Sequence, residues 1–386
     1  MRYLFSIVLC LFYLHSPGQA SFYDYIPLGP YQVGYCDTIL FNESIPYSQF
    51  GYTGASPMFV QIWHPLEKQS NRSFLHYGDF RKRNVPEQLK FVYSELSAHL
   101  DTSFIQYNLS EELSTYETLD FGPYAPAEVL NSVKSFETRS SYSKIDKKLN
   151  FPVILYHHGS QGLSDENFIM AEYFASRGYI FVSANFHLPY DNKLPFGLEE
   201  GVKNDHSAVK VLTAFAKALT NNDKAFYVGH SWGAQAGWCY LYEPGWADAF
   251  VSMETTIEFK KDSLEIKDKW PFVYDAVKIQ KKTYAIPILM FANTQEDKPF
   301  PFFENIGSND ILYVSAKDSF EHDSYNCTYL MRYFFRAQFE QPDTELLKKQ
   351  IGLYAKHLKM IDAFFHSVLQ KEPFDREIFK GDFYIN

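Results

Sequence analysis

Short apolar runs alternate with longer segments of helical periodicity over the second half of the chain. Two of these segments, 167–177 and 204–220, repeat apolar residues at helical spacing. Alternation of buried strands and helices is typical of a mostly parallel sheet covered on both faces. The pattern therefore predicts an α/β fold. The apolar runs that predict its strands are 151–156, 179–185, 225–228, 249–254, 286–292 and a weaker one at 312–314.

The pattern differs before residue 151. A strand through about residue 40 and a second at 58–63 predict an antiparallel hairpin. Between 67 and 150 two helical pieces, 86–99 and 126–136, are separated by polar loops, which indicates an insertion over one end of the sheet that helps to shape the substrate entrance.

The segment 343–369 has apolar residues at helical spacing and predicts a last helix packed on the sheet. Together these elements predict a single α/β domain over 21–386, with a mostly parallel eight-stranded sheet, helices on both faces and a helical insertion at about 67–150. No internal repeat or low-complexity tract interrupts it.

Residues 1–20 have the pattern of a cleavable secretory signal. Arg2 precedes an apolar run at 3–13, and the small residues Gly18 and Ala20 stand near the exit. The run is too short to span a bilayer. We therefore expect a secreted or periplasmic protein without a transmembrane segment. Of its four cysteines one lies in the signal, so at most one intramolecular disulfide can form.

Composition narrows the possible partners. The 386 residues carry a formal net charge of −10, and basic residues gather only in short groups such as Arg81-Lys82-Arg83. Binding to nucleic acid needs a clustered basic surface, so we expect no nucleic-acid partner. The sequence makes no prediction about the oligomeric state.

The stretch Gly229-His230-Ser231-Trp232-Gly233 lies between the apolar run 225–228 and a helix that begins near Ala234. A serine on such a strand-to-helix turn is a nucleophile elbow, and glycines flank it because larger side chains would collide with the neighbouring strand and helix. The alternative is an ordinary glycine-rich turn. We predict that Ser231 is a nucleophile.

A serine hydroxyl needs an imidazole to accept its proton and a carboxylate to orient that imidazole. In α/β hydrolases, which carry this kind of elbow, the order along the chain is serine, acid, histidine. Three histidines follow Ser231, and His322 is the one in a loop just after the last predicted strand, so we predict it as the general base. The alternative is a solvated loop histidine. His357 and His366 fall in the last helix and are predicted to be core or surface residues.

The acid has two candidate positions. Glu254 ends the predicted sixth strand, whereas Glu296 and Asp297 follow the seventh. The residues by themselves leave this choice open. The turn after 151–156 begins with His157-His158, which we interpret as turn residues and not as a metal site, because no third ligand stands at a suitable spacing. The same turn could direct the amide of Ser160 towards a substrate carbonyl oxygen.

Four segments of the chain resemble segments of secreted α/β-hydrolases related to plasma-type platelet-activating factor acetylhydrolase, and of dienelactone-hydrolase-like serine esterases. They are GPYQVGY at 29–35, HHG at 157–159, GHSWGAQ at 229–235 and the loop of His322. The resemblance implies that the acid follows the sixth strand, which favours Glu254 over Asp297, although this family has aspartate there. It also implies an oxyanion hole made by the amides of Ser160 and Trp232, and no metal or other cofactor.

We therefore expect a serine hydrolase that cleaves small-molecule or lipid carboxylic esters through an acyl-enzyme on Ser231. The resemblance suggests a phospholipase A2-type activity on platelet-activating factor as an alternative. A peptidase on the same fold is another, and a non-catalytic binding protein that kept the fold is a third.

Overall fold

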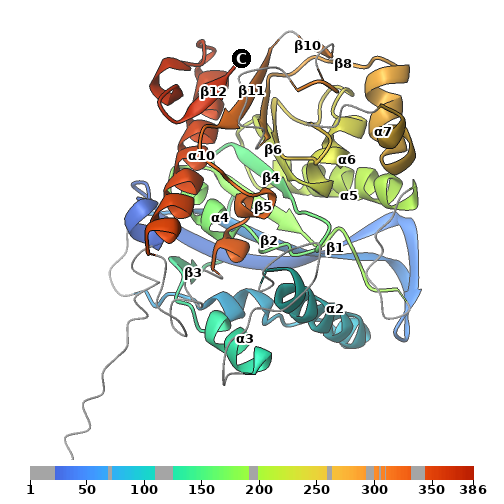
Figure 1. Ribbon diagram of the computed structural model, residues 1–386. Coiled ribbons are helices and arrows are strands. Elements are labelled where there is room, and N and C mark those ends of the chain that lie inside the picture. The colour runs from blue at the N-terminus through green and yellow to red at the C-terminus, as the bar shows by residue number, and fades with distance from the viewer. Residues whose placement is uncertain are drawn as a thin grey trace, which may run out of the picture.

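The computed structural model describes residues 22–67, 72–108, 125–190, 199–258, 263–292, 300–303, 306–308, 310–331 and 344–386. Its centre is a ten-stranded sheet in the order β12-β11-β9-β7-β6-β4-β5-β2-β1-β3 (Figure 1). Neighbouring strands from β5 through β4, β6, β7 and β9 to β11 are parallel, whereas β2 pairs antiparallel with both β1 and β5. The predicted α/β fold with a mostly parallel sheet is confirmed.

The sheet strands are β1 (Gln32–Gln49), β2 (Tyr52–Leu66), β3 (Ser140–Tyr142), β4 (Val153–His157), β5 (Ile180–Ala184), β6 (Ala225–His230), β7 (Ala249–Met253), β9 (Ile288–Ala292), β11 (Ile311–Ala316) and β12 (Phe383–Ile385). A separate two-stranded sheet joins β8 (Thr283–Tyr284) to β10 (Gly307–Ser308). The eight expected strands are present. The sheet exceeds the expected number by two, because the three-residue strands β3 and β12 extend its edges, and strands this short carry no readable periodicity.

The helices, with short 3₁₀ and π turns labelled η, are η1 (Tyr77–Arg81), η2 (Glu87–Leu89), α2 (Lys90–Ser103), η3 (Phe104–Asn108), α3 (Pro126–Lys134), α4 (Phe168–Ala175), α5 (Glu199–Ala218), α6 (Trp232–Tyr240), α7 (Ser263–Lys269), α8 (Pro271–Tyr274), η4 (Asp275–Ile279), η5 (His322–Tyr325), α10 (Thr344–Gln370) and η6 (Glu377–Phe379). α4 and α10 cover one face of the sheet, and α5 and α6 cover the other (Figure 1). Strand β4 illustrates the division: Ile154 and Tyr156 enter the core with α4 and α10, whereas Val153 and Leu155 enter the core with α5 and α6.

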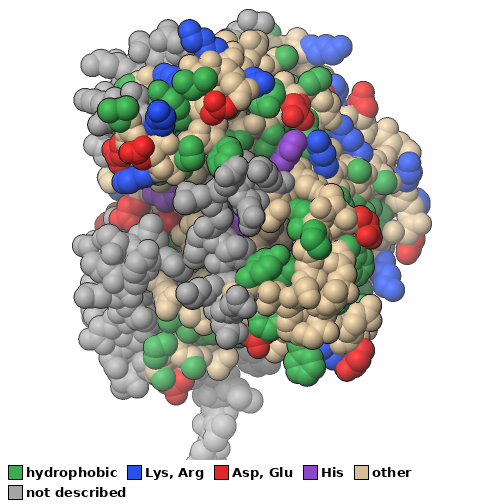
Figure 2. Space-filling model, turned by 90° about the vertical axis from the view of Figure 1, so that its right-hand side faces the viewer, with side chains coloured by type: hydrophobic (Ala, Val, Ile, Leu, Met, Phe, Trp, Pro, Cys, Tyr) green, Lys and Arg blue, Asp and Glu red, His purple; other side chains and the backbone are tan. Residues whose placement is uncertain are grey.

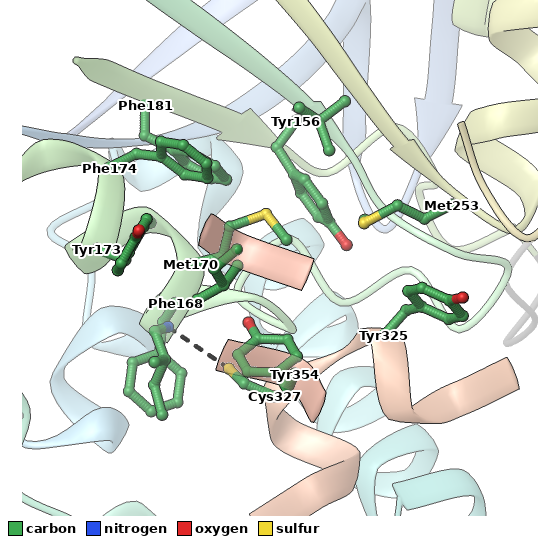
Figure 3. Packing of buried hydrophobic residues seen from close by; sticks show 14 of the residues in the cluster. Tyr156, Phe168, Met170, Tyr173, Phe174, Phe181, Met253, Tyr325, Cys327 and Tyr354 are labelled. Carbon is green, nitrogen blue, oxygen red and sulfur yellow. Dashed lines mark hydrogen bonds between the residues drawn. The ribbon is translucent and has the colours of Figure 1, made fainter. Parts of the chain in front are cut away.

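Figure 3 shows the first of these cores at close range. Tyr156 and Phe181 of the sheet meet Met170 and Phe174 of α4, while Tyr354 of α10 closes the cluster from the other side. Large aromatic side chains thus fill the space between the sheet and its helices, which accounts for part of the high aromatic content.

The described part of the insertion packs beneath β1 and β2, on the same face as α4 (Figure 1). The ring of Tyr77 in η1 lies 5.1 Å from Phe168 of α4, and Arg81 Nε lies 2.8 Å from an oxygen of Asp165. The insertion therefore shares a core with the sheet. Whether it shapes a substrate entrance stays a prediction.

Four further observations concern the surface, membrane-spanning helices, the cysteines and the predicted signal. On the face that Figure 2 draws, hydrophobic, basic and acidic side chains are interspersed. No helix within the described ranges is both long and apolar enough to cross a membrane. Cys36, Cys239 and Cys327 are free cysteines. The predicted signal at 1–20 lies outside the described residues.

The register of the parallel strands decides where their following loops meet. His157 of β4 pairs with Gly229 of β6, and His230 of β6 pairs with Met253 of β7. The three strands therefore end at one edge of the sheet, where ligands bind in open α/β sheets. The residues that follow them, Ser160, Ser231 and Glu254, leave the sheet side by side.

Candidate active site

Ser231 occupies the sharp turn between β6 and α6. Its backbone has φ 51° and ψ −111°, a conformation that costs free energy for any residue but glycine and is typical of functional turns. The flanking glycines are sterically required. A Cβ at Gly229 would lie 2.5 Å from the carbonyl carbon of Gly233, and one at Gly233 would overlap the carbonyl oxygen of His157. This is the geometry expected of a nucleophile elbow.

His322 and Glu254 come together beside this turn. His322 begins η5, shortly after β11, and Glu254 directly follows β7 with φ 38°. The distance from His322 Nδ1 to Glu254 Oε1 is 3.6 Å, and neither Nδ1 nor the second oxygen, Oε2, has a hydrogen-bond partner among the described residues. The contact is an ion pair somewhat longer than a hydrogen bond.

Acidic neighbours set the protonation of His322. Burial by itself lowers the pKa of an imidazole, but contact with Glu254 and the charges of Asp323 and Glu258 outweigh it and raise the pKa of His322 to about 9. Burial, and next the charge of Glu254, raise the pKa of Glu258 to about 7. The imidazolium is therefore stabilised in this pocket, as a base that receives a serine proton requires.

Two backbone amides are available next to Ser231. A Cβ at Gly159 would lie 3.6 Å from Ser231 Cβ, so the turn that carries Ser160 borders the serine. Within the described residues, the amides of Ser160 and Trp232 have no hydrogen-bond acceptor, whereas the next amide along, that of Gly233, donates to the carbonyl of His158. Two unpaired amides near a nucleophile suit the oxygen of a tetrahedral intermediate.

Comparison with known proteins gives a structural match without a sequence match. No protein-family model and no curated protein matches the chain. A ferulic acid esterase from Streptomyces cinnamoneus is similar in structure, with a TM-score of 0.53 and 10% identity over 90% of this chain and 94% of that chain. The chain has the α/β-hydrolase fold.

Two further esterase structures match part of the chain. Est1E from Butyrivibrio proteoclasticus covers 54% of it at 15% identity, with 89% of Est1E aligned and a TM-score of 0.33. The esterase Est2 from Thermogutta terrifontis, with propionate bound, covers 57% at 17% identity, with 86% of that chain aligned and a TM-score of 0.37. At these values the likeness is weak, and neither protein says anything further about this chain.

The loop of His322 is held by a buried pair that the sequence did not reveal. His230, just before Ser231, has Nε2 3.2 Å from the carbonyl oxygen of His322 and Nδ1 3.2 Å from Glu166 Oε1. Glu166 also accepts hydrogen bonds from the amide of Gly159 at 3.0 Å and the hydroxyl of Tyr156 at 2.6 Å. Burial would raise the pKa of Glu166, but these contacts and the nearby histidines lower it. One carboxylate thus ties the Ser160 turn to the His322 loop.

The other acids and histidines considered from the sequence lie elsewhere in the molecule or outside the described residues. Asp297, the alternative acid, and Glu296 lie outside the described residues. His357 is buried in α10, where burial lowers its pKa to about 3, and His366 is exposed. His157 and His158 are fully buried. Among the residues that the structure describes, no cluster of three or more His, Cys, Asp or Glu could hold a metal ion.

A small cavity of about 20 Å³ lies beside α6. Trp232, Gln235 and Cys239 of α6 line one wall, and Trp270 and Phe272 at α8 line the other. Neither α7 nor α8 was predicted from the sequence.

Proposed function

We propose that this chain is a serine hydrolase that cleaves carboxylic esters. The observation that supports it most is the strained elbow of Ser231 between unpaired amides and a Glu254–His322 pair. A fold alone would not suffice, because the α/β-hydrolase fold also carries other chemistries.

In the proposed mechanism, Ser231 Oγ attacks the ester carbonyl carbon while His322 Nε2 accepts the hydroxyl proton. The amides of Ser160 and Trp232 donate to the oxyanion that forms. The imidazolium then gives its proton to the leaving alcohol, and the C–O bond breaks to leave an acyl-enzyme. Water, deprotonated by His322, attacks this ester, and the proton returns to Ser231 as the acid leaves.

Glu254 is proposed as the acid that orients His322. Its carboxylate faces Nδ1, which leaves Nε2 for the serine, and its charge stabilises the imidazolium. Asp297 remains the alternative.

The decisive experiment uses purified protein with p-nitrophenyl acetate and butyrate and with a fluorophosphonate probe. We expect turnover and covalent labelling by the wild type, and loss of both in Ser231→Ala. Ser160→Ala, which keeps the amide, is the matched control and should retain activity. Wild-type protein that neither turns over nor labels would leave the non-catalytic binding protein as the better interpretation.

The finer substrate assignment rests on the sequence resemblance. Short-chain or oxidised phospholipids of the platelet-activating factor type are the proposed lipid substrates. Acyl-chain profiling on p-nitrophenyl esters, compared with platelet-activating factor in vesicles, separates a simple esterase from a phospholipase. Processing after about residue 20, read from the mass of the exported protein, tests the proposed secreted or periplasmic location.

A further inference from the structure

A buried carboxyl lies behind the indole of Trp232. Asp205 on α5 is fully buried, and its Oδ2 accepts a hydrogen bond from Trp232 Nε1 at 2.6 Å. Its second oxygen, Oδ1, has no hydrogen-bond partner among the described residues. A buried carboxyl with an unused acceptor costs free energy, so its presence here needs an explanation.

The same carboxyl also faces the strand that leads to Ser160. His157 Nε2 lies 3.6 Å and His187 Nε2 3.9 Å from Asp205 Oδ2, and all three side chains are buried. His157 ends β4, three residues before Ser160, and Gly233 packs directly on its carbonyl oxygen. Asp205 therefore contacts Trp232 directly and lies beside the end of the strand that leads to Ser160.

We propose that Asp205 is a positioning residue for the oxyanion hole, fixing the Trp232 amide through the hydrogen bond to its indole. Trp232 is the first residue of α6, so rotation of its side chain and tilting of its amide are linked through one Cα. A small misdirection of an oxyanion donor has a large effect on rate. This inference rests on the proposed function and deepens it.

The charge of Asp205 adds a measurable signature. Burial raises its pKa to about 8, against the opposing effect of the Trp232 hydrogen bond. The carboxyl is therefore uncharged below this pH and becomes a carboxylate above it. A negative charge behind the donors opposes the oxyanion, so its formation should slow the reaction.

Within the described part of the chain, no charged group faces Asp205 to offset that effect. Burial lowers the pKa of His157, and lowers that of His187 to about 3, so both imidazoles are neutral. Burial raises the pKa of the other titratable groups near it, so they are neutral as well; these are Tyr227 of β6 and Cys239 and Tyr240 of α6.

The experiment compares Asp205→Asn, Asp205→Leu and Trp232→Phe on p-nitrophenyl butyrate, with the exposed Asp223→Asn as the matched control. Asn can still accept the indole hydrogen but cannot ionise. It should keep most of the kcat at low pH, and the ratio of its kcat to that of the wild type should rise through about pH 8. Both proteins share the part of the pH profile that comes from protonation of His322, so it cancels in this ratio.

Asp205→Leu cannot accept the hydrogen bond, so it should lower kcat by roughly 10- to 100-fold with little change in KM. Trp232→Phe should do the same. The double variant should be no worse than either single one, since both remove one interaction. Losses that multiply in the double variant, or a ratio for Asp205→Asn that stays flat with pH, overturn the proposal.

Asp205→Leu could fail to fold, in which case Trp232→Phe and the pH ratio of Asp205→Asn decide. A wild type without Ser231-dependent turnover or labelling removes the proposed function, and this inference with it. If the wild type is active but neither Asp205→Asn nor Asp205→Leu changes kcat, only the inference about Asp205 is overturned.

Discussion

At the scale of single residues, the choice between two carboxylates is the most informative test. If Glu254 orients His322, Glu254→Gln would favour the wrong imidazole tautomer and lower kcat by roughly 10³- to 10⁴-fold while the fold persists. Asp297→Asn should cost little. Steady-state kinetics and circular dichroism of both variants check this. Loss of turnover in Asp297→Asn with activity kept in Glu254→Gln would assign the acid to the segment after β9.

The pH profile tests the same pair independently. His322 must be neutral to accept the serine proton, and its pKa is raised to about 9, so kcat/KM should rise with pH up to that value. The charge of Glu254 contributes to this raised pKa of His322. Glu254→Gln should therefore move the apparent pKa down towards the ordinary value of 6.5. If the apparent pKa of the kcat/KM profile is unchanged in that variant, Glu254 does not interact with His322.

Single residues show most clearly what the sequence patterns could and could not predict. Ser231 carries a local motif and His322 follows from chain order, so both could be proposed as candidates from the residues alone. Glu166 and Asp205 could not, because their partners lie 64 and 27 residues away in sequence. Asp165-Glu166-Asn167 before α4 has the composition of an ordinary helix cap, and nothing in it reveals a buried carboxylate.

At the scale of elements, the elbow makes a steric prediction. Gly233→Ala would drive a methyl group into the carbonyl of His157 and should destabilise the protein by about 2 kcal/mol or more while lowering activity. Gly352→Ala is the control, since no atom lies within 4 Å of its added Cβ and it stands inside helix α10. It should stabilise by about 0.5–1 kcal/mol. Urea unfolding measures both, and equal effects would mean that the contact with His157 does not restrict position 233.

Element prediction succeeded where apolar periodicity was long enough. The parallel strands were found because they are continuous apolar runs, and α10 because its stripe extends over 27 residues. The edge strands β3 and β12 and the short helices α7 and α8 were missed. They are too short to show a repeating apolar pattern, and β12 is placed by a tertiary contact, its pairing with β11.

At the scale of the whole molecule, the described part of the predicted insertion is joined to the turn before α4 by charge as well as by packing. Arg81 binds Asp165 through two contacts, Nε to Oδ2 at 2.8 Å and a second nitrogen to Oδ1 at 3.1 Å, and both side chains are buried. Asp165 precedes Glu166, which contacts the Ser160 turn and His230. Sequence patterns predicted an insertion at about 67–150 but could not tell which face of the sheet this segment covers, because its contacts, such as Arg81 with Asp165, are long-range.

Removing Arg81 should therefore affect stability and activity together. Arg81→Ala leaves Asp165 buried without its cation, and we expect a loss of roughly 3–5 kcal/mol in the free energy of unfolding. Lys82→Ala next to it is the matched control: its ion pair with Asp79 is exposed, and the expected loss is below about 1 kcal/mol. Denaturant titration and esterase activity on the same samples give both quantities. If the two variants unfold alike, the buried pair does not hold the insertion to the sheet. If Arg81→Ala loses stability but keeps full kcat at a temperature where it remains folded, the insertion stabilises the fold without reaching the site through Asp165 and Glu166.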